Sequence, residues 1–115
     1  MLKDHLLPNE IIELERSSPG LKFNSKPYDI IAVSNRRIIF YKVGEFYKRD
    51  IVEAIEFPYV TDVKCKMKGL FKKRGVLEIQ TDSHHIVEGD FSDITRAFRV
   101  LSKYTNKDEV DSNDE

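Results

Sequence analysis

The densest group of chemically active side chains in this sequence is a basic run near its middle. Six positive charges fall within eleven residues, at Lys64, Lys66, Lys68, Lys72, Lys73 and Arg74. The first three alternate with Val63, Cys65 and Met67, which is the two-residue period of a half-buried strand with lysines on its outer face. The following loop, residues 69–75, continues the basic run and carries two apolar residues, Leu70 and Phe71.

This basic surface, defined as Lys64, Lys66, Lys68, Leu70, Phe71, Lys72, Lys73 and Arg74, is compatible with three roles. Outward lysines on a strand keep a sheet edge from pairing with other chains. The same residues would also suit contact with a protein partner or with a second copy of the chain. Alternatively they would attach the protein to an anionic membrane, where each basic residue contributes about 1 kcal/mol. Nucleic acid is disfavoured as a partner, because no aromatic ladder accompanies the lysines.

The remaining reactive residue types do not form a catalytic or metal-binding pattern. His84 and His85 are adjacent, so on a strand they point to opposite faces, and no carboxylate or thiol stands at ligand spacing beside them. We therefore expect no metal and no cofactor. Cys65 fits a small buried apolar position. The loop at 69–75 lacks the Gly-Lys-Ser/Thr ending of a phosphate-binding loop, and no nucleophile, base and oxyanion donors assemble, so the sequence does not indicate an enzyme.

The clearest structural signal is a β-hairpin made of residues 28–33 and 37–43 around the turn-prone pair Ser34-Asn35. Asparagine tolerates the left-handed conformation that a tight turn requires, which predicts that role for Asn35. Arg36 and Arg37 follow the turn. We interpret this arginine pair as structural, holding the hairpin through a strand carboxylate such as Asp29, rather than as ligand-binding.

Other apolar runs predict further strands over residues 10–16, 60–68, 76–81 and 84–88, while 21–27 reads as a loop. Residues 51–57 fit either a strand or a helical turn. A helix is predicted over 91–104, because its apolar residues recur at spacings of three and four and form one packing face. The residues of this helix packing face are Phe91, Ile94, Phe98 and Leu101. Asp90 or Ser92 can cap its start.

The sum of these elements is an α+β fold, mainly β, of about seven antiparallel strands and one C-terminal helix. The apolar face of the helix must cover an open edge or mouth of the sheet. We expect one domain over residues 1–104 and an acidic, disordered tail over 105–115. The tail holds five acidic residues and one lysine, so the rest of the chain carries a net charge of +3 against −1 for the whole.

Composition points to the cytoplasm. The chain has a single cysteine, which suits a reducing compartment, and its N-terminus has no apolar segment of the kind a secretory signal needs. No stretch approaches the roughly 20 apolar residues that span a bilayer. Attachment at the inner face of the membrane stays compatible with the basic surface.

Four segments together resemble the bacterial and archaeal PH-like (pleckstrin-homology-like) domains, which are related to GRAM domains. They are the Ser-Asn-Arg-Arg-Ile-Ile-Phe hairpin at 34–40, the opening Leu-Pro-Asn-Glu-Ile-Ile at 7–12, residues 50–51 with 59–63, and Gly-Val-Leu-Glu-Ile at 75–79. The resemblance spans roughly residues 6–104, although Asn9 stands where the family usually has glycine. It implies a PH-like barrel or half-barrel of two near-orthogonal antiparallel sheets with one end plugged by the helix.

The sequence and this resemblance predict a non-enzymatic binding or assembly module. Protein–protein interaction, including self-association through sheet edges or the 69–75 loop, is the first hypothesis. Peripheral binding to anionic lipid headgroups through the basic surface is the alternative. Some members of the resembled family are thought to form rings or larger oligomers, which fits the first hypothesis.

Overall fold

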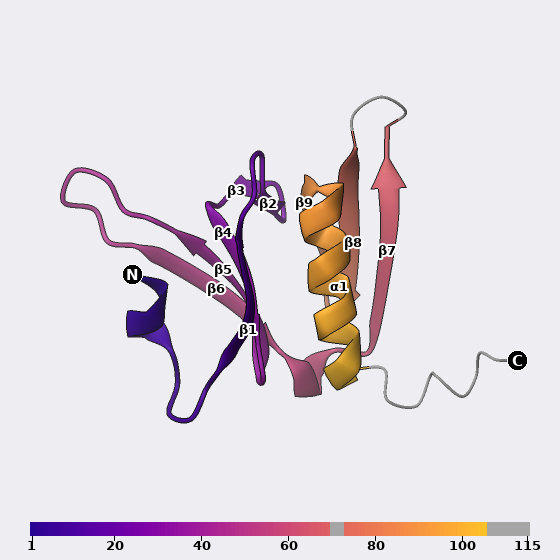
Figure 1. The fold of residues 1–115 in the computed structure, drawn as a ribbon, viewed down its shortest axis with the longest axis horizontal. Coiled ribbons are helices and arrows are strands. Elements are labelled where there is room, and N and C mark those ends of the chain that lie inside the picture. Colours follow the sequence, from indigo (N-terminus) through magenta and orange to yellow (C-terminus); the bar gives the residue numbers. More distant parts are fainter. Residues whose placement is uncertain (70–72, 106–115) are drawn as a thin grey trace, which may run out of the picture.

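The computed structural model describes residues 1–69 and 73–105 (Figure 1). Within these residues the fold consists of nine short strands, two 3₁₀ helices and one α-helix. In chain order the elements are η1 (Leu2–His5), β1 (Ile12–Ser17), β2 (Lys22–Phe23), β3 (Lys26–Pro27), β4 (Ile30–Ser34), β5 (Arg37–Lys42), β6 (Ile51–Glu56), η2 (Phe57–Tyr59), β7 (Asp62–Lys68), β8 (Arg74–Gln80), β9 (His84–Asp90) and α1 (Phe91–Thr105). None of the described helices is long and apolar enough to cross a lipid bilayer.

The first sheet has the order β1-β4-β5-β6, and all its pairs are antiparallel. Strands β4 and β5 are buried along almost their whole length, because both faces of this sheet are covered. Ile38 and Phe40 face the main core, whereas Ile39 and Tyr41 belong to a second cluster on the opposite face. Leu2 of η1 covers that second cluster, so the N-terminal segment closes the outer face of the sheet.

The second sheet has the order β3-β2-β9-β8-β7 and is also antiparallel. The prediction of a loop over residues 21–27 is wrong at this point, since β2 and β3 form a small hairpin. Asn24 and Ser25 supply its turn with φ of 52° and 70°, and this geometry is the left-handed pair that two-residue hairpins require. Phe23 pairs with Val87 and joins the hairpin to β9.

Helix α1 lies between the two sheets, where it contacts β7, β8 and β9 of one sheet and β1 and β4 of the other (Figure 1). Asp90 caps its start by accepting hydrogen bonds from the Ser92 and Asp93 N–H groups. Two ion pairs tie it to β1: Arg16 Nε lies 3.1 Å from Asp93 Oδ1, and Lys103 Nζ lies 3.0 Å from Glu13 Oε1.

The mainly β fold with one C-terminal helix, predicted from the sequence, is confirmed. The ambiguous segment 51–57 forms strand β6 followed by the first residue of η2. The two sheets, however, do not close into a barrel, since no strand pair within residues 1–69 and 73–105 joins them. The connection between β6 and β7 turns through η2, which leaves β6 at the edge of the first sheet and β7 at the edge of the second.

Candidate functional site

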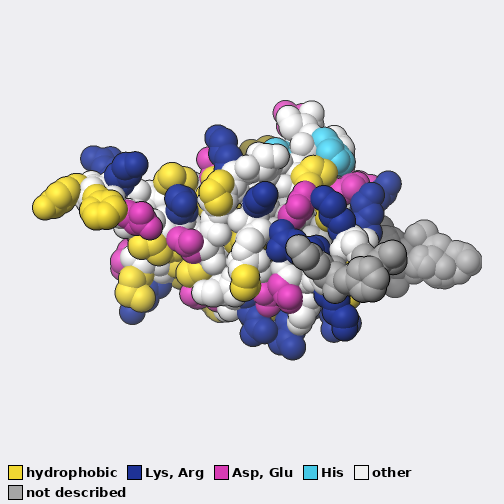
Figure 2. Space-filling view, turned by 90° about the horizontal axis from the view of Figure 1, so that it is seen from above, with side chains coloured by type: hydrophobic (Ala, Val, Ile, Leu, Met, Phe, Trp, Pro, Cys, Tyr) yellow, Lys and Arg dark blue, Asp and Glu magenta, His cyan; other side chains and the backbone are white. Residues whose placement is uncertain are grey.

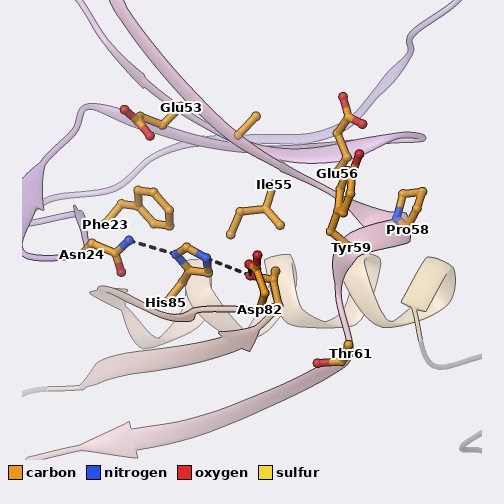
Figure 3. A pocket seen from close by; sticks show the side chains of 12 residues that line it. Phe23, Asn24, Glu53, Ile55, Glu56, Pro58, Tyr59, Thr61, Asp82 and His85 are labelled. Atoms are coloured by element: carbon orange, nitrogen blue, oxygen red, sulfur yellow. Dashed lines mark hydrogen bonds between the residues drawn. The ribbon is translucent and has the colours of Figure 1, made fainter.

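A broad cleft lies where the two sheets fail to close (Figure 3). Its volume is about 800 Å³, and it is broadly open to solvent. Strand β6 and the following η2 form one wall, while the β2–β3 turn and the β8–β9 turn form the other. Helix α1 passes behind it in Figure 3. The cleft therefore exists because the two sheets do not close into a barrel, and no single loop forms it.

Aromatic stacking builds the inner end of the cleft. Phe23 lies between two rings, with centroid distances of 4.1 Å to Phe40 and 5.7 Å to His85. The His85 ring is fixed from both sides, because its Nδ1 lies 3.0 Å from Asn24 Nδ2 and its Nε2 lies 3.2 Å from Thr81 Oγ1 (Figure 3). This end of the cleft is consequently rigid and apolar, with one imidazole at its rim.

The outer part of the cleft is acidic. Three exposed residues with carboxylates, Glu53, Glu56 and Asp82, line it, and none of the described lining residues is a lysine or an arginine. Tyr59 stands at the mouth with 67% of its surface exposed. Negative charge beside an exposed aromatic ring favours cationic side chains as the groups that this cleft accepts.

One wall of the cleft is also a free sheet edge. Among the described strands β6 pairs only with β5, through residues 51–56 and 37–42. The backbone N–H and C=O groups on the opposite side of an edge strand are available to a further strand. The cleft thus offers main-chain hydrogen-bonding groups together with side-chain carboxylates.

The described residues of the predicted basic surface lie along β7, at Lys73 and at the start of β8. Lys64, Lys66 and Lys68 are exposed, but Lys66 Nζ lies 2.9 Å from Glu78 and Lys68 Nζ lies 3.6 Å from Glu88. The ion pair with Lys66 holds the pKa of the Glu78 carboxyl below its ordinary value. These contacts reduce the positive field of Lys66 and Lys68, because each of these two charges has an acidic neighbour.

The C-terminal end of the basic surface, at Arg74, has backbone carbonyl oxygens as partners instead of carboxylates. The Arg74 guanidinium donates hydrogen bonds to the Pro19 and Gly20 carbonyl oxygens, at 3.2 and 2.9 Å, and so braces the loop after β1. Lys73 is exposed. The predicted apolar tip Leu70-Phe71 and Lys72 lie outside the described residues. Met67, expected on the inner face, is 58% exposed, because the end of β7 extends beyond the main core.

The hairpin residues Asn35, Arg36 and Arg37 lie close together between β4 and β5. The expected left-handed conformation of Asn35 is not observed, since its φ is not positive. Its side chain instead accepts a hydrogen bond from the Ile11 N–H at 2.9 Å. The turn is held by Ser34 Oγ, which accepts from the N–H groups of Arg36 and Arg37 at 3.0 and 3.1 Å.

The expected pairing of Arg37 with a strand carboxylate such as Asp29 is wrong. Arg37 Nε lies 2.9 Å from Glu10 Oε2, and its Nη2 lies 3.1 Å from Glu10 Oε1, so the pair is bidentate. The Glu10 side chain is fully buried and also accepts from Ser34 Oγ at 2.6 Å. Asp29 instead accepts from the Val43 N–H at 2.8 Å. Arg36 is exposed.

The four residues of the helix packing face are buried to different depths, and Ile94, Phe98 and Leu101 pack in or against the main core. Ile94 and Leu101 are fully buried, whereas Phe91 and Phe98 are half-buried at the margins of the face. Cys65 is half-buried beside the core, and burial raises the pKa of its thiol. His84 Nδ1 donates a hydrogen bond to Gln80 Oε1 at 2.9 Å on the exposed face, away from the cleft that His85 lines.

Comparison with known families decides the identity of the fold. The chain matches the family of bacterial PH domains over residues 7–103, which is most of its length. The chain belongs to the bacterial PH domain family. No curated protein matches it. PH-like domains are generally non-enzymatic binding modules. The two antiparallel sheets and the C-terminal helix of this PH domain agree with its membership of the family.

Sequence reasoning missed the residues of the cleft. Glu53, Glu56, Asp82 and His85 are separated in the chain and carry no shared motif, so each reads as an ordinary surface residue. They come together only because β6 ends one sheet opposite the β8–β9 turn of the other. The one usable local signal was Asn24-Ser25, a turn pair that would have placed Phe23 on a strand.

Proposed function

We propose that this PH domain is a non-enzymatic protein-binding module whose cleft takes an extended, positively charged segment of a protein partner. The observation that carries the proposal is the free edge of β6 beside Glu53, Glu56 and Asp82. Extended segments that add to a sheet edge gain affinity from main-chain hydrogen bonds and specificity from alternate side chains. Here side chains on both faces of the added segment meet carboxylates.

Side-chain geometry supports a segment with spaced lysines or arginines. Glu53 and Ile55 point to the same face of β6, whereas Glu56 points to the other, because successive residues of a strand alternate. Ile55 is buried in the core, and Tyr59 lies just beyond it at the mouth of the cleft. An incoming strand can therefore place cations against Glu53 and Glu56 and lay an aliphatic stem on Tyr59.

Self-association is the special case in which a second copy supplies the segment. Strand β7 is itself an edge strand, and Lys64, Lys66 and Lys68 lie along it. Joining β7 of one copy to β6 of another is a head-to-tail contact, which leaves one free edge of each kind at the ends of an assembly. Such assemblies either close into rings or extend.

The arrangement in the cleft suits binding better than catalysis. Asn24, His85 and Thr81 form a hydrogen-bonded row, which superficially resembles an orienting group, a base and a nucleophile. The Thr81 hydroxyl, however, accepts from the Ser83 N–H at 3.1 Å and so closes the β8–β9 turn. We therefore assign the row to the rigidity of the cleft wall.

The test is a calorimetric titration of the protein with a synthetic lysine-valine peptide whose lysines stand three positions apart, so that in an extended segment they fall on opposite faces, as Glu53 and Glu56 do. We expect saturable binding that Glu53→Gln/Glu56→Gln weakens by about tenfold, since two charge contacts are lost. The matched control, Glu15→Gln/Glu45→Gln, removes the same charge from exposed positions outside the cleft and should bind as the parent does. Equal weakening of peptide binding by both double variants would show that only net charge matters, and it would refute the cleft as the binding site.

Binding of the basic surface to anionic lipid headgroups stays the alternative proposal. It rests on Lys64 and Lys73, which are exposed, while Lys66, Lys68 and Arg74 have the acidic or carbonyl partners described above. Replacement by glutamate of both Lys64 and Lys73 should abolish co-sedimentation with phosphatidylserine vesicles if this alternative holds. Unchanged co-sedimentation would remove it.

A further inference from the structure

Among the described residues, exposed apolar surface is concentrated on one hairpin. This hairpin lies at the opposite end of the molecule from strands β7 and β8 (Figure 1). The segment 43–50 joins β5 to β6 and projects well beyond both sheets. Phe46 is 87% exposed and Tyr47 is fully exposed, while Val43 and Ile51 at its base are about half exposed. We name Phe46 and Tyr47 the aromatic tip. Two adjacent exposed aromatic rings form an apolar patch of the kind that marks an interaction site.

The backbone of the aromatic tip is in an unfavourable conformation. Phe46 and Tyr47 have φ of 48° and 67°, and the Lys48 N–H donates to the Glu45 carbonyl at 3.0 Å across the turn. Two successive left-handed residues define the hairpin turn that ordinarily takes Asn-Gly. Bulky side chains are rare in this conformation, and such strain concentrates at functional positions.

The base of the hairpin holds the tip in place. Asp50 accepts hydrogen bonds from the Gly44 N–H at 2.8 Å and from the Tyr41 hydroxyl, whose pKa this contact raises to about 12. A Cβ atom on Gly44 would lie 2.1 Å from the Lys48 carbonyl oxygen, so only glycine fits between the two arms. The tip is thus a built feature of the hairpin and is presented in one orientation.

Positive charge surrounds the tip. Lys42, Lys48 and Arg49 lie on or beside the same hairpin, against two carboxylates, the exposed Glu45 and the half-buried Asp50. Figure 2 shows hydrophobic side chains at the extreme left of the molecule with lysine and arginine side chains directly beside them. A net positive charge next to exposed aromatic rings complements an anionic interface with an apolar interior.

We propose that the 43–50 hairpin docks this PH domain onto an anionic phospholipid bilayer. Phe46 and Tyr47 insert into the interfacial region of the bilayer, where the Tyr47 ring, which has one polar end, is favoured at the level of the headgroups. Lys48 and Arg49 contact lipid phosphates. A bilayer fits this convex, narrow tip because it yields around an inserted ring, whereas a protein partner would need a pocket matched to it.

This inference is independent of the cleft and of the basic surface. None of the residues of the aromatic tip lines the cleft, and the hairpin projects from the far end of β5 and β6, away from β7 and β8 (Figure 1). A chain docked by this tip leaves the cleft open toward other proteins. Failure of vesicle binding would consequently leave the protein-binding proposal intact, and the reverse also holds.

The experiment uses the full chain with vesicles of phosphatidylcholine alone or with added phosphatidylserine. Because the sequence contains no tryptophan, Phe46→Trp creates a single fluorescent reporter at the tip. We expect co-sedimentation with the anionic vesicles only, weaker at high salt, and a blue shift of the tryptophan emission on binding. A Met67→Trp variant, which reports from the exposed end of β7, should show no shift.

Two double variants separate the tip from the rest of the surface. Phe46→Asn/Tyr47→Gly replaces the strained pair with residues that favour the turn, so it should fold at least as stably yet lose about tenfold or more in vesicle partition. Lys48→Glu/Arg49→Glu should lose at least about tenfold, whereas the matched control Lys22→Glu/Lys26→Glu keeps the parent partition.

Three results would overturn the proposal. The parent protein failing to sediment with phosphatidylserine vesicles at low salt would show that the tip serves another contact, such as a protein. Sedimentation without a tryptophan shift at position 46 would place the membrane contact elsewhere. Full vesicle partition of the Phe46→Asn/Tyr47→Gly variant would show that the two aromatic rings do not contribute to membrane binding.

Discussion

Glu10 and Arg37 form the most deeply buried ion pair among the described residues, and they fix the N-terminal segment against the first sheet. The Arg37 guanidinium also donates to the His5 carbonyl at 3.0 Å, and Glu10 accepts from the Leu7 N–H at 2.8 Å. This network spans residues 5–37 and holds η1 over the outer cluster of the sheet. Removing one partner leaves the other charge buried without compensation.

Arg37→Ala should therefore lower the free energy of unfolding by about 3–5 kcal/mol, measured by urea denaturation. The adjacent Arg36→Ala is the matched control, because Arg36 is exposed and should change stability by no more than about 0.5 kcal/mol. Similar losses of unfolding free energy in both variants would show that the buried ion pair does not stabilise the fold.

The same pair predicts how stability depends on acidity. Burial raises the pKa of the Glu10 carboxyl, but hydrogen bonds from Arg37, from a backbone N–H and from Ser34 outweigh it, so the folded-state pKa lies below the ordinary 4.5. A lowered folded-state pKa stabilises fully above pH 4.5, and the stabilisation disappears as pH falls through the folded value. Glu10→Gln should flatten this acid decline of the unfolding free energy. An unchanged slope would contradict the assignment.

At the scale of elements, helix α1 approaches the second sheet closely because two glycines face it. Gly75 and Gly89 pair across β8 and β9. A Cβ atom at Gly75 would lie 2.8 Å from Ile94 Cβ and 3.1 Å from the Phe91 Cα, and one at Gly89 would lie 3.3 Å from Ile94 Cδ1. The absence of side chains there lets Ile94 reach the sheet.

Gly75→Ala should push the helix outward and lower the free energy of unfolding by about 1–3 kcal/mol, as expected for overpacking. Gln80→Ala on the same strand is the comparison, since Gln80 is only half-buried and should lose much less. Thermal unfolding of the two variants measures the difference. A Gly75→Ala variant as stable as the parent would mean that helix α1 can move away from the sheet without loss of stability, which would contradict close packing at Gly75.

Elements with strong periodicity were predictable from sequence, and elements defined by long-range pairing were not. The helix and the β4–β5 hairpin follow from the spacing of Ile94 and Leu101 and of the apolar run at 37–43. The partner of Arg37 could not be chosen, because Glu10 and Asp29 are both carboxylates on flanking segments. Nor did the sequence reveal the aromatic tip, since Phe46-Tyr47 lacks the residues that ordinarily mark such a turn.

At the scale of the whole molecule, the open architecture gives this PH domain three separate surfaces. The acidic cleft lies along β6, and the lysines lie along β7. The hairpin that carries the aromatic tip projects from the far end of the first sheet (Figure 1). The cleft exists because the sheets do not close into a barrel. That arrangement depends on how two sheets are placed in space, which no local sequence pattern encodes.

Charge exchange between the two edges tests self-association. Glu53→Lys/Glu56→Lys makes β6 basic, and Lys64→Glu/Lys66→Glu makes β7 acidic, so neither variant can join its own two edges. An equal mixture restores opposite charges at every contact. Light scattering should show monomers of each variant and assemblies of the mixture. If the parent protein is itself a monomer at high concentration, self-association through these edges is excluded.

The most direct test of the protein-binding proposal is a map of the contact by nuclear magnetic resonance. The ¹⁵N-labelled full chain is titrated with the lysine-valine peptide while the amide signals are followed. The proposal predicts that the largest shifts fall on residues 53–59 and on Thr81, Asp82 and His85, the two walls of the cleft. Shifts confined to residues outside these walls, or no shifts at saturating peptide, would contradict it.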